Sequence, residues 1–362
     1  MSAQDFTTRL QVQLREAAER EARRGALARA LAAARPRSAV ALGAVATAVA
    51  AALVIVAIGL VGSRAPEPAT PPGPRVAADV AVGDALGSSG RLGFGAMWLS
   101  DSSQGAILRV DPRTRRVTRR IPVGSEVALG TAGGSVWALP RGPGSEGGPL
   151  LRIEPRGGRT LARVDLDRAA GAPFRGGVLM VGGGRVWALG ATGGVAVDPA
   201  RNRVVAAIRL GGSFTIDDAL VRGGELWLTR ADRSVTRFDA RTGRRLGRLP
   251  WRTAGVLVPF GDRLISVTKR SVALVDAATG RPEWRRRIGT ALSVAQVSGA
   301  RVFVTGADGP AAARDRIWEI DGRSGEIAGA VTMPEFGPAG MVAAGDGVWL
   351  LTAGGRAVVV RP

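Results

Sequence analysis

The residues of this sequence best suited to bind a ligand are one acidic pair and one group of bases. Asp217 and Asp218 are adjacent, and their carboxylates could bind a cation or a cationic ligand. The alternative is a solvated acidic pair at the start of a strand. The bases would make one sector of the same end of the fold positive, unless they are simply solvated loop charges. They are Arg230, Arg233, Lys269, Arg270, Arg314 and Arg316.

The residue types that are missing limit the chemistry further. The 362 residues include no Cys, His or Tyr. A Ser-His-Asp triad, a His-based zinc site and c-type haem attachment are therefore excluded. The sequence predicts no catalytic residue, no metal ligand and no bound cofactor.

The chain is strongly basic, with a formal net charge of +20, and Lys269 is its single lysine. A field of this sign attracts anionic polymers or lipid headgroups. We expect an exposed basic rim that contacts an anionic cell-envelope polymer or phospholipid headgroups. Nucleic acid is not expected, because the location is exported and no aromatic stacking pattern accompanies the arginines. The rim residues are Arg113, Arg115, Arg116, Arg156, Arg159, Arg201, Arg203, Arg241, Arg244, Arg245, Arg281 and Arg323.

These residues belong to a unit that recurs along the chain. Each unit begins with a glycine turn and a short strand that holds a bulky anchor residue. The spacings between successive anchors are 39, 50, 40, 38, 38 and 46 residues, which fit four-stranded propeller blades. The sequence therefore predicts an all-β, seven-bladed β-propeller over residues 76–362. The anchors are Trp98, Trp137, Trp187, Trp227, Ile265, Phe303 and Trp349.

Two details of the repeat make specific predictions. The last unit stops at Val360 without an outer strand, and the segment 76–82 before the first unit supplies a spare one. Pairing the two would close the ring and remove two open sheet edges. An acid followed by a turn recurs after the second strand of most units, which predicts turns capped by aspartate side chains. These aspartates are Asp111, Asp198, Asp239, Asp276 and Asp321.

The repeats resemble known propeller families. The stretch GAMWLSDSSQGAILRVDPRTRRVTRRIPVG is similar to streptogramin-lyase-like and YVTN-type repeats, and VDAATGRPEWRRRIG, with Trp284, resembles the tryptophan-docking repeat of PQQ-type quinoproteins. The resemblance covers residues 76–362 and implies the propeller fold. The resemblance does not imply a lyase activity, because the sequence has no His that could take the catalytic role. The eight blades, calcium site and vicinal cysteines usual in quinoprotein dehydrogenases are also not seen in the sequence.

The part of the chain before the propeller predicts a membrane anchor. Residues 38–63 hold no charged side chain and are long enough for one uncleaved transmembrane helix. The tail 1–37 predicts a basic amphipathic helix that lies on headgroups or docks a cytoplasmic partner protein. Residues 64–75 predict a stiff Pro-rich linker. By the positive-inside rule, we expect a single-pass protein of the bacterial cell membrane, with the tail cytoplasmic and the propeller extracytoplasmic.

Three functions follow from this organisation. We favour a membrane-tethered extracytoplasmic propeller that acts as a non-catalytic binding or scaffold module for anionic envelope components. The first alternative is an enzyme, either a PQQ- or metal-dependent oxidoreductase or a lyase relative that uses carboxylates. The second is a sensor that couples an external ligand to the cytoplasmic tail.

Overall fold

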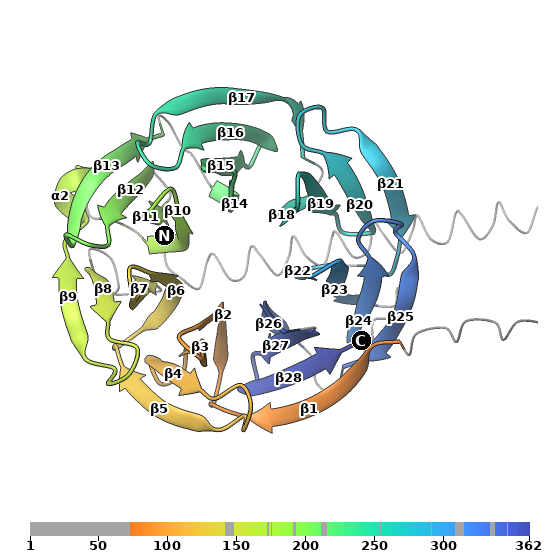
Figure 1. Cartoon of the computed structure of the whole chain (residues 1–362), viewed down its shortest axis with the longest axis horizontal. Coiled ribbons are helices and arrows are strands. Elements are labelled where there is room, and N and C mark those ends of the chain that lie inside the picture. The colour runs from red at the N-terminus through yellow and green to blue at the C-terminus, as the bar shows by residue number, and fades with distance from the viewer. Residues whose placement is uncertain are drawn as a thin grey trace, which may run out of the picture. The chain divides into compact units, whose positions relative to one another are not determined.

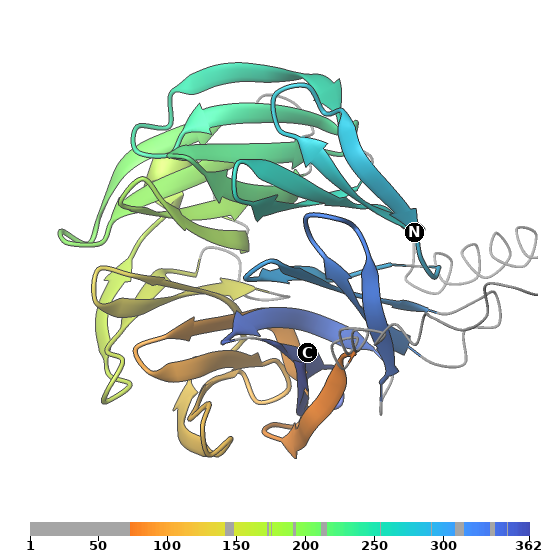
Figure 2. The same ribbon diagram turned by 45° about the vertical axis from the view of Figure 1, so that its right-hand side comes forward.

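Seven antiparallel sheets of four strands follow one another along the chain and stand around a central axis (Figure 1). The structure is a computed structural model, and it describes residues 73–141, 148–171, 174, 176–190, 193–210, 216–253, 255–290, 292–307, 315–333, 337–345 and 347–362. Seen after a 45° turn, the blades are successive twisted sheets (Figure 2). The predicted seven-bladed propeller of four-stranded blades is confirmed.

Each blade runs from an inner strand beside the axis to an outer strand on the perimeter (Figure 1). The inner strands are β2 (Leu86–Gly93), β6 (Glu126–Ala132), β10 (Gly176–Gly182), β14 (Ile216–Arg222), β18 (Val256–Phe260), β22 (Ala295–Ser298) and β26 (Pro338–Ala344). The second strands are β3 (Ala96–Asp101), β7 (Ser135–Arg141), β11 (Arg185–Gly190), β15 (Glu225–Arg230), β19 (Arg263–Val267), β23 (Arg301–Ala307) and β27 (Gly347–Thr352).

The outer half of each blade is built in the same way. The third strands are β4 (Ala106–Val110), β8 (Leu150–Ile153), β12 (Gly193–Asp198), β16 (Ser234–Asp239), β20 (Ser271–Asp276), β24 (Asp315–Asp321) and β28 (Arg356–Arg361). The outer strands are β5 (Val117–Pro122), β9 (Thr160–Val164), β13 (Arg203–Arg209), β17 (Arg245–Arg252), β21 (Pro282–Arg287), β25 (Ile327–Thr332) and β1 (Arg75–Ala81).

The anchor residues of the repeat all lie on the second strands and are buried. Every residue of β3 and of β27 is buried, which explains why the sequence is apolar almost without interruption there. The described buried apolar residues form seven clusters, and each cluster joins two neighbouring blades. Each blade therefore depends on both of its neighbours to cover its apolar faces.

The ring is closed by the first and last strands of the propeller. β1 pairs antiparallel with β28, in a register that places Arg75 opposite Arg361 and Ala81 opposite Arg356. In Figure 1 the orange β1 lies along the blue β28 at the perimeter of the seventh blade. The predicted closure by the spare early strand is confirmed, with the strand beginning one residue earlier than expected.

Tryptophan side chains fasten neighbouring blades at the perimeter. The indole N–H of Trp284 in β21 donates to the carbonyl of Gly322 in the next blade at 3.1 Å, and its ring covers Gly325. Gly325 has a φ of +72°, and a Cβ there would approach the ring to 2.6 Å, so only glycine fits. Trp251 covers Gly280 of the following blade in the same way. The resemblance to docking repeats pointed to Trp284 and missed Trp251.

Two local features differ from the repeat pattern. The short helix α2 (Asp167–Ala170) fills the long connection between β9 and β10 and ends at Gly171, whose φ is +75°. In the first blade, Phe94 occupies the left-handed region with a φ of +54°, where the second and third blades have Gly133 and Gly183. A left-handed aromatic residue is strained, so Phe94 departs from the turn chemistry of its neighbours.

Several predictions concern residues that lie outside the described part of the chain. They are the basic tail 1–37, the transmembrane helix 38–63 and most of the linker 64–75. Within the described residues, no helix has the length and apolar character that a bilayer crossing requires.

Trp187 gives a direct test of how strongly neighbouring blades depend on each other. Its ring is fully buried, and its indole N–H donates to the carbonyl of Ala240 in the next blade at 2.7 Å. We expect Trp187→Ala to lower the free energy of unfolding by about 3–5 kcal/mol, because a large cavity opens at the interface. Trp187→Phe should cost clearly less, since most of the volume remains. Urea unfolding measures both, and equal losses would contradict a packing role for the ring.

Candidate functional site

The blades present two chemically different faces. The connections from inner to second strands and from third to outer strands lie on one face, which we call the turn face; in the fourth blade these are residues 223–224 and 240–244. The other face, the loop face, carries the starts of the inner strands and the loops between second and third strands, such as residues 231–233. The predicted ligand-binding residues belong to the loop face, and the predicted basic rim belongs to the turn face.

Three of the predicted ligand-binding residues line one pocket on the loop face. Asp218 comes from β14, Arg233 from the β15–β16 loop and Lys269 from the β19–β20 turn. The pocket has a volume of about 250 Å³ and lies where the fourth, fifth and sixth blades meet. It combines one carboxylate and two cations with hydroxyl and apolar groups. The other lining residues are Thr229, Thr253, Gly255, Val256, Val267, Thr268 and Leu292.

The carboxylate of Asp218 ties two blades together. One oxygen accepts a hydrogen bond from the backbone N–H of Ala219 at 2.8 Å, and the other accepts from the N–H of Leu257 in the next inner strand at 3.2 Å. Ser89 does the same for the first two blades, because its hydroxyl accepts from the N–H of Leu129 at 2.7 Å. Asp218 therefore positions the wall of the pocket through backbone contacts. Asp217 lies in β14, and its side chain is outside the described residues.

Three other predicted residues do not line this pocket. Arg230 ends β15 and lines a different pocket, between the third and fourth blades. Arg270 is exposed in the β19–β20 turn, where its backbone N–H donates to the hydroxyl of Thr268 at 3.2 Å. Arg316 lies in β24, opposite Gly306 of β23. Arg314 is outside the described residues.

The three threonines of the pocket were missed by sequence reasoning. Thr229 follows the anchor Trp227 on the same strand, and Thr253 and Thr268 sit in connections between strands. Their hydroxyls converge only because the fourth and fifth blades are adjacent. The repeat pattern contains no signal that would single them out.

The turn face carries the predicted basic rim. Eleven of the twelve rim arginines are exposed, and the twelfth, Arg115, is half-buried with a φ of +61°. They occupy the turns between third and outer strands, which recur around the ring. The expected exposure of the rim is confirmed, while what it contacts stays a prediction.

Aspartate side chains hold these turns in shape, as predicted. The carboxylate of Asp239 accepts hydrogen bonds from the backbone N–H groups of Arg241 and Thr242 and from the Thr242 hydroxyl, at 3.1, 2.7 and 2.7 Å. The backbone amides of the two residues at the same positions donate to each of the other four aspartates. Arg113, Arg241 and Arg323 therefore contribute their backbone N–H groups to these turns and have exposed side chains. Arg201 also donates from its guanidinium group to the carboxylate of Asp198 at 3.2 Å.

The same hydrogen bonds lower the pKa values of the turn carboxyls. For Asp239 and Asp276 the largest cause is the hydrogen bond from a threonine hydroxyl, and for Asp111 it is the backbone N–H of Thr114. In Asp198, desolvation raises the pKa, but hydrogen bonds from Ala200 and Arg201 outweigh it and the net shift is downward. The turns are thus held most firmly by ionised carboxylates.

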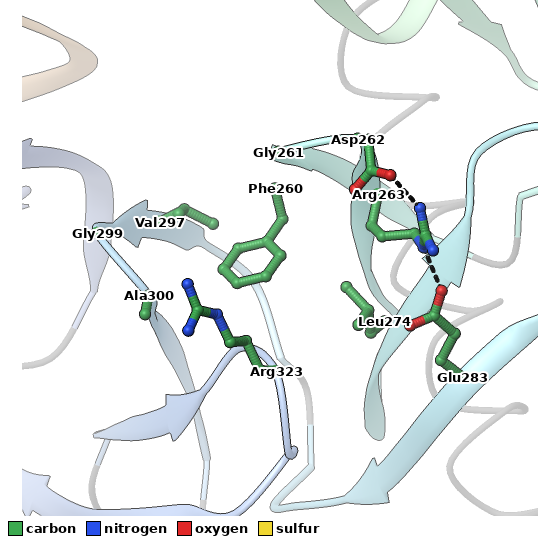
Figure 3. A pocket seen from close by; sticks show the side chains of 10 residues that line it. All are labelled: Phe260, Gly261, Asp262, Arg263, Leu274, Glu283, Val297, Gly299, Ala300 and Arg323. Carbon is green, nitrogen blue, oxygen red and sulfur yellow. Dashed lines mark hydrogen bonds and ion pairs between the residues drawn. The ribbon is translucent and has the colours of Figure 1, made fainter.

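A second pocket, of about 480 Å³, opens on the turn face between the fifth and sixth blades (Figure 3). On one side the guanidinium group of Arg263 donates to the carboxylates of Asp262 and Glu283. On the other side lies the side chain of Arg323, with the ring of Phe260 between the two groups (Figure 3). The pocket places a net negative wall and a positive wall around an apolar centre.

Exposed apolar side chains also gather on the turn face. Of the seven large apolar side chains that are exposed among the described residues, six lie in a turn-face hairpin or within three residues of the turn-face end of a strand. Only Val256 lies at the loop face. The six are Leu92, Phe94, Leu161, Val181, Val205 and Ile327.

The chain joins the propeller on this same face. β28 begins at the loop face and ends with Arg361 at the turn face, so Arg75, opposite Arg361, also lies at the turn face. Just before it, Gly73 and Pro74 lie against Ala328 and Gly329 of the sixth blade, at the turn-face end of β25. The described chain therefore enters the propeller at the turn face.

Comparison with known proteins identifies the family. A family profile described as outer membrane protein assembly factor BamB matches residues 146–252 and 231–362, which together cover more than half of the chain. The chain belongs to this family of PQQ-type propellers. No curated protein matches the chain.

Solved structures share the fold of this PQQ-type propeller at low sequence identity. The computationally designed Ika8 protein is 14% identical, with a TM-score of 0.58, and the match covers 77% of this chain and 97% of that one. BamB from Moraxella catarrhalis is 17% identical, with a TM-score of 0.52, and the match covers 77% of this chain and 84% of that one. At these identities, the likeness shows the fold alone.

The described residues of this PQQ-type propeller do not fit a quinone–metal site. No aromatic ring lines the loop-face pocket, so a flat quinone would find no stacking partner there. Across the described part of the chain, no three His, Cys, Asp or Glu residues are grouped so that they could hold a metal ion.

The lowered pKa values predict how the propeller responds to acid. The turn aspartates have folded pKa values below their unfolded value of about 3.9, so their stabilisation is complete above that pH and is lost as the pH falls through the folded values. We expect a melting temperature that is steady between pH 7 and about pH 5 and falls below about pH 4. Differential scanning calorimetry across this range measures it.

Asp239 provides the matched variants for that experiment. Asp239→Asn keeps an acceptor oxygen but does not titrate, so the decline below pH 4 should be shallower than in the wild type. Asp239→Ala should melt at a lower temperature at every pH. If the melting temperature of Asp239→Asn fell with pH as steeply as that of the wild type, Asp239 would not be a source of the acid sensitivity.

Proposed function

We propose that this chain is a membrane-tethered, extracytoplasmic propeller without catalytic activity, which acts as a binding or scaffold module. In this proposal, the turn face lies against the anionic phospholipid headgroups of the membrane that anchors the chain. The loop face, with its pocket of mixed charge, then points away from the membrane and is open to a partner.

The attachment point is the observation that carries this proposal. Arg75 begins β1 at the turn face, and the segment predicted to cross the membrane ends at residue 63. The eleven residues 64–74 between them span at most about 40 Å when fully extended. A tether of this length keeps the turn face, rather than the loop face, next to the bilayer.

The chemistry of the turn face supports the same orientation. Exposed arginines near an anionic bilayer contribute about 1 kcal/mol each to binding. Apolar side chains among them can enter the boundary between headgroups and acyl chains. The rim arginines and Phe94, which is 44% exposed at the tip of a turn, supply both kinds of contact on one face.

The scaffold role rests on the family. The profile that matches this chain is described as an assembly factor for outer membrane proteins, which is a binding role at a membrane. A rigid ring with a polar pocket on its outward face suits the same kind of task. The pocket holds a carboxylate and two cations, so we expect a partner that presents both charges.

Neutralising part of the rim tests the membrane contact. Arg113→Gln, Arg156→Gln and Arg241→Gln remove three exposed charges, while the backbone N–H groups that donate to the turn aspartates remain. We expect the triple variant of residues 73–362 to bind vesicles of phosphatidylglycerol and phosphatidylcholine roughly 10- to 100-fold more weakly than the wild type at low salt. Co-sedimentation measures the binding.

A matched triple variant on the loop face provides the control. Arg252→Gln, Arg270→Gln and Arg287→Gln remove the same charge from exposed positions at the opposite end of the strands. Binding of this variant should stay close to that of the wild type. Equal losses in both variants, or binding to purified cell wall and not to vesicles, would overturn the headgroup proposal.

Phe94 tests the apolar part of the contact. We expect Phe94→Gly to weaken vesicle binding several-fold, because the exposed ring is removed. Its melting temperature should change by only a few degrees, since relief of the left-handed strain, about 1–2 kcal/mol, offsets lost contacts and glycine entropy. Unchanged vesicle binding would show that the ring does not enter the bilayer.

A further inference from the structure

A pocket between the third and fourth blades is lined by four arginines and by no acid. It has a volume of about 200 Å³ and lies between the outer strands β13 and β17, which are neighbours on the perimeter of the ring (Figure 1). It is distinct from the loop-face pocket, and it shares only Arg245 with the rim. Its lining residues are Arg209, Leu210, Arg230, Thr236, Phe238, Arg245 and Arg248.

A β-bulge brings two of these arginines to the same side of the blade. Residues three apart on a regular strand, such as Arg245 and Arg248, face opposite sides. Here Phe238 pairs with Arg245 and Thr236 pairs with Arg248, so Leu246 is an extra residue in β17. The neighbouring Gly247 has a φ of +137°, which absorbs the distortion. Both arginines therefore share the face that carries Thr236 and Phe238.

The other two arginines reach the pocket from different strands. Leu228 in β15 pairs with Thr236, so Arg230, two residues further on, lies on the same face of the fourth blade. Arg209 ends β13 of the third blade, directly after the buried Ile208. Two blades and three strands thus contribute guanidinium groups to one space, above a buried floor that includes Phe238 and Thr236, each 4% exposed.

The electrostatics of this arrangement favour an anion. Four like charges around one small pocket repel one another, and none of the residues that line it carries a negative charge. The nearby Asp232 is held mainly by hydrogen bonds from Ser234, and the charges of Arg230 and Arg252 lower its pKa further. Arg209, Arg245 and Arg248 therefore give the described lining of the pocket an excess of positive charge.

The geometry points to a phosphate group as the ligand. Each guanidinium group presents a planar fork of donors that matches two oxygens of a phosphate, and several forks can hold one multiply charged group. The buried hydroxyl of Thr236 adds a neutral donor, and Phe238 with Leu210 offers an apolar surface to the organic part of an ester. We propose that this pocket binds a phosphate ester or diphosphate.

Titration with simple phosphates tests the pocket. The full-length chain in a neutral detergent is titrated by calorimetry with pyrophosphate, inorganic phosphate and glycerol phosphate at constant ionic strength. We expect saturable binding in the wild type and at least a 10-fold weaker dissociation constant in Arg245→Gln/Arg248→Gln. Arg285→Gln/Arg287→Gln, which removes the same charge from the exposed outer strand β21, should bind as the wild type does.

Two further variants distinguish the loss of a binding site from misfolding of the protein. Arg209→Gln lies at the exposed end of β13 and leaves the β16–β17 register untouched, and it should also weaken binding several-fold. Arg245→Lys keeps the charge but not the fork, so its affinity should fall between those of the wild type and the glutamine variant. Binding that is not saturable, or that is the same in the pocket variants and the wild type, would overturn the proposal.

The phosphate group could belong to a free phosphate compound or to a lipid headgroup, and the same titrations distinguish these two sources. They also distinguish this pocket from the membrane contact proposed for the rim. A free phosphate ligand predicts tight pyrophosphate binding, whereas a lipid headgroup predicts that glycerol phosphate binds more tightly than inorganic phosphate. The rim variant Arg113→Gln/Arg156→Gln/Arg241→Gln should still bind pyrophosphate, and the pocket variant Arg209→Gln, which leaves every rim arginine in place, should still sediment with vesicles. Loss of pyrophosphate binding in the rim variant would place the phosphate site at the turn face instead.

Discussion

The hydrogen bonds between β1 and β28 hold the ring closed, and the rest of the molecule depends on that closure. Every blade buries apolar side chains against the blade before it and the blade after it, in seven separate clusters. An open row of seven blades would leave two of these apolar faces exposed to water. The early strand completes the seventh blade, so the apolar face that it shares with the first blade is covered as well.

Closure also determines what the two faces can do. Since the strands alternate in direction, the inner-to-second and third-to-outer connections fall on the turn face. The second-to-third connections and the starts of the inner strands fall on the loop face. The turns repeat with little variation, so they build a uniform ring of arginines supported by aspartates such as Asp239. The loop-face connections vary from blade to blade, and one sector of them forms the pocket around Asp218, Arg233 and Lys269.

The sequence allowed the fold to be predicted because its signals are repeated. The fold follows from seven anchors at blade-sized spacings, recurring turn aspartates and one spare strand. Together they leave few alternatives to a closed seven-bladed propeller. The position of Lys269 near Asp218 and Arg233 could be expected from the same alignment, because equivalent places in neighbouring blades lie side by side. The turn aspartates were recognised for the same reason, since a residue that recurs in most blades has a structural role.

Features that occur once could not be predicted in this way. The bulge at Leu246 shifts the register of β17 by one residue, and no sequence motif other than Gly247 indicates it. Without that shift, Arg245 and Arg248 would face opposite sides of the blade. The helix α2 and the left-handed Phe94 likewise depend on a local insertion and a local substitution in an otherwise regular turn.

The way β1 enters the ring has a mechanical consequence. A pull on the preceding segment reaches the propeller at Arg75, which pairs with Arg361 at the same end of the two strands. A load applied between Arg75 and Arg361 would therefore separate β1 from β28 one residue pair after another. Release of β1 would uncover the edge of β28, the strand that it covers in the seventh blade.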